Sequence, residues 1–144
     1  SPQDVMDDAL AALEAVRWGD PHGADADHLK TQEDVDRTAA VGFTFFTIDP
    51  SGHVDQHADD YNEATLREKI DSLRDSISWL DSYTQKPILL ATGVKIHFTE
   101  GEVMRAAVKY GTAIEAAIQL ADYICQIQTE AEREYEIELS IDET

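Results

Sequence analysis

Residues 23–55 read GADADHLKTQEDVDRTAAVGFTFFTIDPSGHVD and combine two short strand signals with a helix signal between them. The helix signal begins at Thr31, a residue type that often caps helix N-termini, and stops at Gly42, a residue type that often ends helices. Residues 43–48 form an almost unbroken apolar run, which is typical of a parallel-sheet strand covered on both faces. The stretch therefore predicts one β-α-β unit.

Charged and imidazole side chains gather where these two strands would end. Asp27, His28 and Lys30 follow the first strand signal, and Asp49 follows the second. Imidazole and carboxylate are good ligands for Zn, Mn, Fe or Ni. A lysine beside a helix N-terminus can pair with a substrate carboxylate, and an acid at the mouth of a buried strand is a catalytic candidate. The same residues also fit hydrogen bonding at a helix start and an ordinary turn.

A third group of candidates follows the second strand. His53, Asp55 and His57 have the spacing H-x-D-x-H. In an extended segment the three side chains would share one face, which suits a metal, whereas in a loop the spacing means little.

These phrases resemble the metal-dependent tagaturonate epimerases, a family that interconverts two keto-hexuronates. The resemblance rests on residues 24–31 (ADADHLKT), 42–50 (GFTFFTIDP), 53–55 (HVD) and 138–144 (ELSIDET). It implies C4 epimerisation of tagaturonate to fructuronate by a larger, barrel-type α/β enzyme with a divalent metal cofactor.

The resemblance also implies roles for individual residues. His28, with Asp27 beside it, would bind the metal, and His53 with Asp55 would belong to a loop that shields or binds the uronate substrate. Asp142 and Glu143, at the end of the last phrase, are the expected proton-transfer residues. Alternation along the strand makes Asp142 the inward candidate of the two.

The fold class that we expect is α/β, as a partial TIM-barrel-like parallel sheet with outer helices. Its three strands would cover about residues 22–28, 43–48 and 136–142. The first of these is a poor strand by propensity, because Asp and Gly are depleted in strands, and it is expected only because of the resemblance. A hairpin lobe turning near Gly93 would lie within an insertion of about residues 62–98. A closed barrel typically needs about 250 residues, and this chain has 144. We therefore expect a segment of a larger barrel-type domain, with the rest of the barrel missing and little activity by itself.

Charge and cysteine content limit the possible partners and compartments. The chain has 30 acids against 11 lysines and arginines, a formal net charge of −19, which disfavours nucleic acid and anionic membranes as partners. Cys125, the single cysteine, falls in an apolar pattern with Ile114, Ile118 and Ala121 and is expected in the core. One cysteine suits a reducing, cytoplasmic compartment, and the lack of a long apolar run suits a soluble protein. The small-molecule uronate substrate is implied by the resemblance.

Two alternatives to the epimerase remain open at this point. A metal-dependent sugar aldolase would use similar residues on the same scaffold. A non-catalytic acidic interaction module would leave the Asp and His residues without a chemical role.

Overall fold

The computed structural model describes residues 1–75, 77–84 and 87–141. The chain divides into two compact units. Among the described residues, the first unit consists of Ser1–Pro50 and residues 117–141, and the second consists of Ser51–Ala116. The predicted insertion of about residues 62–98 falls within the second unit.

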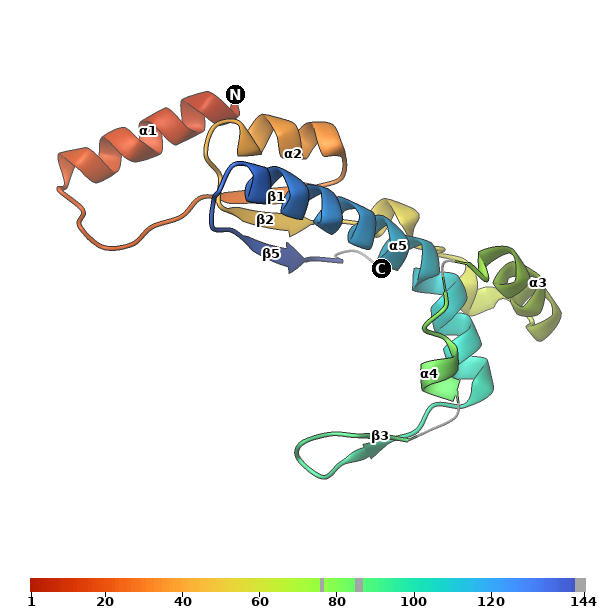
Figure 1. Ribbon diagram of the computed structural model, residues 1–144. Helices are drawn as coiled ribbons and strands as arrows, with labels where there is room; N and C mark the ends of the chain where they lie inside the picture. Colours follow the sequence, from red (N-terminus) through yellow and green to blue (C-terminus); the bar gives the residue numbers. More distant parts are fainter. Residues whose placement is uncertain (76, 85–86, 142–144) are drawn as a thin grey trace. The chain divides into compact units, whose positions relative to one another are not determined.

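The first unit is built on a three-stranded parallel sheet with the order β1-β2-β5 (Figure 1). The strands are β1 (Asp25–Leu29), β2 (Phe45–Ile48) and β5 (Glu136–Leu139). The predicted α/β class and the parallel pairing of the three strands are confirmed. The strands are shorter than predicted, because residues 22–24 and 43–44 lie outside the sheet and β5 ends at Leu139.

Helices cover one face of this sheet. The helix α2 (Gln32–Ala39) begins with a reciprocal capping box between Thr31 and Asp34, and the long helix α5 (Glu100–Glu130) sends its last turns over the same face (Figure 1). A third helix, α1 (Pro2–Ala15), contributes one buried side chain, Met6. The core under these helices consists of Met6, Ala26, Leu29, Val35, Ala39, Phe43, Phe46, Ile48, Ala117, Leu120 and Ile124.

The other face of the sheet is polar. Phe46 and Ile48 point into the helix-covered core, so Thr47 between them points to the opposite face. β5 is an edge of the sheet, and its apolar residues Ile137 and Leu139 are 39% and 54% exposed. Such an edge is normally paired or covered.

The second unit is mostly helical and carries the predicted hairpin. It contains two short 3-10 turns, η1 (Ser51–His53) and η2 (Ala58–Asp60), the helices α3 (Glu63–Leu73) and α4 (Asp81–Thr84), and the first turns of α5. The strands β3 (Ile88–Leu89) and β4 (Lys95–Ile96) pair antiparallel around Gly93, whose φ of +85° favours glycine. A small core of Ala58, Leu66 and Val108 holds the loop after β2 against α3 and α5.

Among the described residues, none of the helices combines the length and apolar character needed to cross a lipid bilayer.

Candidate active site

The end of β1 has an irregular backbone, which changes the direction of two candidate side chains. Ala26 pairs with Phe46 and Leu29 with Ile48, so β1 holds two residues, Asp27 and His28, opposite one residue of β2. His28 has a φ of +58°, a left-handed conformation that is uncommon outside glycine. Bulges and such conformations occur often at functional sites, where they direct side chains. This geometry singles out His28 within the sheet.

Asp27 and His28 are in direct contact. The Nδ1 atom of His28 lies 2.6 Å from Oδ1 of Asp27, and both side chains are exposed. A carboxylate on one ring nitrogen fixes the orientation of an imidazole and directs its other nitrogen toward a metal or a substrate. The contact therefore suits His28 as the ligand and Asp27 as the residue that orients it.

Lys30 and Asp49 also meet at this end of the sheet. Nζ of Lys30 lies 3.0 Å from Oδ2 of Asp49. The Asp49 side chain is only 5% exposed, whereas the Lys30 side chain is 58% exposed. A buried carboxylate in this position can accept a proton from a substrate. The solvent-accessible cation beside it can pair with a substrate carboxylate. The structure thus joins two residues that the sequence placed at the ends of different strands.

Asp55 belongs to the second unit, where it anchors a loop. Its carboxylate accepts hydrogen bonds from Nζ of Lys69 (2.8 Å), the backbone N–H of His57 (3.1 Å) and the hydroxyl of Tyr61 (3.2 Å). Partial burial raises the pKa of Asp55, but these donors outweigh it and the pKa lies below its ordinary value. His53 ends the 3-10 turn η1, so the H-x-D-x-H segment is not an extended strand with three side chains on one face.

The two acids expected to transfer protons, Asp142 and Glu143, lie outside the described residues. Their roles stay predictions. The strand β5 runs parallel to β2, so its carboxyl end at Leu139 lies at the same end of the sheet as Ile48.

The residues present fit a metal only in part. Within residues 1–75, 77–84 and 87–141, no three His, Cys, Asp or Glu side chains gather closely enough to hold an ion. His28, oriented by Asp27, has suitable chemistry for one ligand.

A polar row crosses the helix-free face of the sheet and was not predicted. The hydroxyl of Thr47, on the central strand, lies 3.1 Å from Oδ1 of Asp25 on β1 and 3.1 Å from Oε2 of Glu138 on β5. Thr47 is only 2% exposed, because the two carboxylates flank it. In a closed barrel this face would line the interior, so the row would extend the polar surface below Lys30 and Asp49.

Replacing Thr47 by valine keeps the shape but removes the hydroxyl between the two carboxylates. We expect Thr47→Val to destabilise the full-length protein by about 1.5–3 kcal/mol, the scale of a lost hydrogen bond to a charged group. Urea unfolding would measure the loss, and Thr47→Ser, which keeps the hydroxyl, is the matched control. An unchanged urea midpoint for the valine variant would show that the row does not stabilise the sheet.

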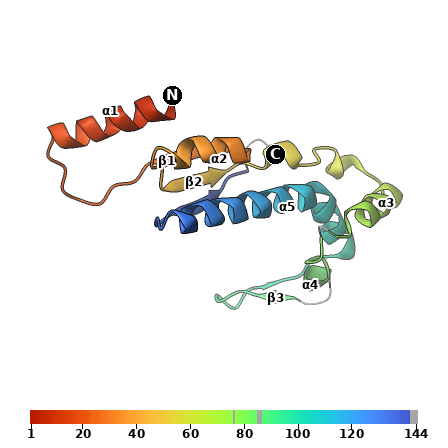
Figure 2. The ribbon, with the colours of Figure 1, turned by 45° about the horizontal axis from the view of Figure 1, so that its top comes forward.

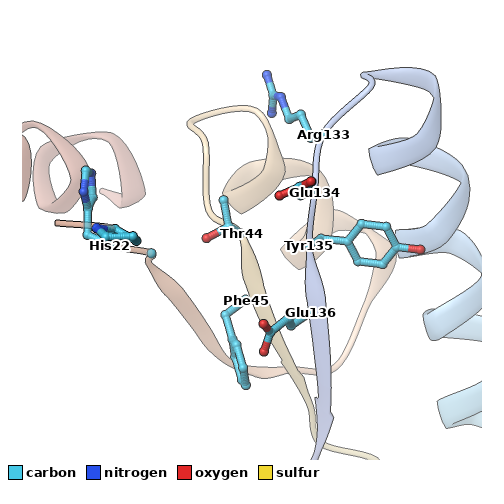
Figure 3. A pocket seen from close by; sticks show the side chains of 9 residues that line it. His22, Thr44, Phe45, Arg133, Glu134, Tyr135 and Glu136 are labelled. Atoms are coloured by element: carbon cyan, nitrogen blue, oxygen red, sulfur yellow. The ribbon is translucent and has the colours of Figure 1, made fainter.

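The amino end of the same sheet carries a hollow of about 860 Å³ (Figure 3). It is lined from the segment before β1, the start of β2 and the turn into β5, with Arg133, Glu134 and Glu136 among its charged residues. Arg133 donates to the carbonyl oxygen of Ala39 at 2.6 Å, which ties the turn before β5 to the end of α2. The hollow lies at the opposite ends of the strands from His28 and Asp49 and contains none of the predicted site residues.

The expectation for Cys125 is wrong. Cys125 is exposed, and so is Ile118, which is 50% exposed. The buried residues on this part of α5 are instead Ala117, Leu120 and Ile124. Ala121, from the same predicted pattern, is partly buried against the core, so the prediction is wrong at Ile118 and Cys125 and not along the whole helix.

Comparison with known proteins identifies relatives along the whole chain. The sequence model of the family described as "UxaE: tagaturonate epimerase" matches residues 1–144. The tagaturonate/fructuronate epimerase of Thermotoga maritima is 33% identical over 150 residues, which cover 99% of this chain and 28% of that protein. This chain thus spans about 28% of the length of the curated relative that it matches.

Solved structures agree with this match. A glycerol-complexed crystal structure of fructuronate-tagaturonate epimerase UxaE from Cohnella laeviribosi is 31% identical and superposes with a TM-score of 0.80, covering 93% of this chain and 27% of that one. The native crystal structure of the same enzyme is 34% identical, with a TM-score of 0.74 and the same coverage of both chains.

Proposed function

This chain belongs to the tagaturonate epimerase family, and from that premise we propose that it forms part of an enzyme that interconverts tagaturonate and fructuronate. Two observations support the proposal. The family match covers the whole chain. The ends of β1 and β2 carry an oriented imidazole, a buried carboxylate and a cation, which are the groups that proton transfer on an anionic sugar requires.

The reaction explains why an acid–base pair is needed. The inverted carbon, C4, is not adjacent to the ketone at C2, so enolisation alone cannot invert it. If a base removes the proton of the C4 hydroxyl, the C3–C4 bond can break, leaving an aldehyde at C4 and an enediolate on C1–C3. Re-addition to the other face of the aldehyde re-forms the bond, and the C4 oxygen takes back a proton. All atoms are retained, and no oxidant is consumed.

We assign the proton transfer to an acid at the carboxyl ends of the strands. Asp142 and Glu143 remain our candidates for the C4 hydroxyl, and Asp49 is the candidate among the described residues. Lys30, 3.0 Å from Asp49, would bind the substrate carboxylate. His53 and Asp55 stay candidates for the surrounding loop, with Asp55 acting through the loop that it anchors.

The proposal includes a divalent cation held in part by Nε2 of His28. A cation bound there would supply positive charge for the developing oxyanion of the ketone. Asp27 would hold the imidazole through Nδ1, in agreement with the 2.6 Å contact.

An aldolase is the second candidate, because the same bond cleavage followed by release of the pieces would give two three-carbon products. Incubating the full-length protein with tagaturonate and separating the products distinguishes the two. We expect fructuronate without accumulation of three-carbon fragments. Fragments in equal amounts, with no fructuronate, would identify an aldolase instead.

We expect the 144-residue chain to be inactive when it is produced alone. The sheet in the described residues has three strands with the order β1-β2-β5, which is too few to close a barrel, so the substrate would meet an open face and not an enclosed cavity. The measurement compares turnover of tagaturonate by this chain and by the full-length protein. Equal turnover would show that three strands are sufficient and would contradict the proposal of a divided site.

A further inference from the structure

The β3–β4 hairpin of the second unit has an apolar face that is partly exposed. Ile88 pairs with Ile96, and the N–H of Leu90 donates to the carbonyl of Val94 at 2.9 Å, so these residues form two directly opposed pairs. Because alternate residues of a strand share a face, all four side chains lie on one side of the hairpin. Leu89 and Lys95, the pair between them, point to the other side.

The described residues leave this face partly open. Leu90 is 41% exposed and Val94 is 55% exposed, Ile88 and Ile96 are half-buried, and none of the four residues belongs to either hydrophobic core. In two views the free end of the hairpin projects away from α3 and α4 (Figures 1 and 2). A two-stranded hairpin is at best marginally stable in water, so a second surface is needed to hold this one in place.

The distribution of acidic residues along the chain indicates which surface covers the hairpin. Residues 82–99 are the longest stretch of the chain without Asp or Glu, and they contain Lys86 and Lys95. All 30 acids lie outside the stretch. Two copies of so acidic a chain repel each other over most of their surface, and the hairpin is where they can approach at the lowest electrostatic cost.

The hairpin face is also suited to contact with itself. Its four side chains are aliphatic and uncharged, so an identical face packed against it buries apolar surface and leaves no buried charge unpaired. Contacts of one surface with its own copy generate closed two-fold dimers. We propose that the Ile88, Leu90, Val94 and Ile96 face of the hairpin is a self-association surface through which two copies of the protein form a dimer.

The test uses the full-length protein and sedimentation velocity at micromolar concentration. We expect the parent to sediment as a dimer, or as a larger even-numbered assembly, and Val94→Lys to halve the mass. Leu89→Lys is the matched control, because Leu89 is 65% exposed and lies on the opposite face. It should leave the mass unchanged.

Three results would overturn the proposal. The parent could sediment as a monomer. Leu89→Lys could dissociate the assembly as fully as Val94→Lys. Val94→Lys could lower the melting temperature at unchanged mass, which would mean that another part of the same polypeptide covers the face.

A second measurement keeps the test decisive if Val94→Lys does not fold. Hydrogen exchange of the parent should show that the Leu90 amide, bonded to Val94, loses protection on dilution below the dimer dissociation constant. Protection that is independent of protein concentration would contradict the proposal.

Discussion

Replacing His28 by alanine in the full-length protein is expected to remove bound divalent metal and epimerase activity together. The imidazole is oriented by Asp27 at 2.6 Å and stands at the bulge where β1 leaves regular pairing with β2. Loss of one of three or four ligands removes both charge and geometry from a metal site, so we expect at least about a hundred-fold loss of turnover. Metal analysis and turnover of tagaturonate measure the two effects.

Two further variants make this result specific. His28→Asn should show the same losses, and because asparagine tolerates the left-handed backbone of residue 28, it separates the imidazole from backbone strain. His22→Ala removes an imidazole at the amino end of the sheet, beside the hollow in Figure 3, and should keep parental metal and turnover. If His28→Ala retains both metal and activity, His28 is a structural residue.

Replacing Asp49 by asparagine should lower turnover by roughly a hundred-fold or more, the usual scale for loss of a general acid or base. The amide is nearly isosteric with the carboxylate, and the exposed Lys30 can be solvated once its partner is neutral, so the fold should survive. Lys30→Gln should instead raise KM for the substrate more than it lowers kcat, because a binding cation would be lost.

A second ion pair of the molecule provides the control. Lys109 and Asp59 lie 2.8 Å apart in the second unit, and Asp59 is 60% exposed. Asp59→Asn should leave both kinetic constants at parental values. Parental turnover for Asp49→Asn would mean that the buried carboxylate only balances the charge of Lys30, and the proton transfer would then rest on Asp142 or Glu143.

Local sequence patterns predicted the elements that depend on neighbouring residues. The apolar run of β2 and its burial, the cap at Thr31 and the hairpin around Gly93 all follow from side-chain type and turn chemistry. β1 is different, because Asp and His are poor strand formers and only the resemblance to a family indicated a strand there. Pairing with the strongly apolar β2 outweighs that weak propensity.

The details of the candidate site depend on contacts between distant residues. The left-handed His28 arises from the register of β1 against β2, which no local pattern encodes. Thr47 sits in an apolar run, and its partners Asp25 and Glu138 are 22 and 91 residues away. The position of Lys30 and Asp49 at neighbouring strand ends was predictable, but their ion pair was not.

Helix α5 shows how a periodic pattern can fail. Over 31 residues, an apolar stripe read from the sequence can drift around a helix that has 3.6 residues per turn. In this part of the helix Ala113, Ala117 and Ile124 are buried, whereas Cys125, directly after Ile124, is exposed. Where small and large apolar residues occupy adjacent positions, the sequence does not specify which face of the helix is buried. Packing against the rest of the protein determines it.

The central claim is that the full-length protein inverts C4 reversibly, and starting the reaction separately from each of the two hexuronates tests this claim most directly. The full-length protein would be incubated separately with tagaturonate and with fructuronate, and the two hexuronates would be quantified until the mixtures stop changing. An enzyme that inverts C4 reversibly must bring both mixtures to the same ratio, while the His28→Ala protein leaves each substrate unchanged. Two mixtures that retain their starting sugars, or that accumulate three-carbon products, would contradict the assignment of this chain to a C4 epimerase.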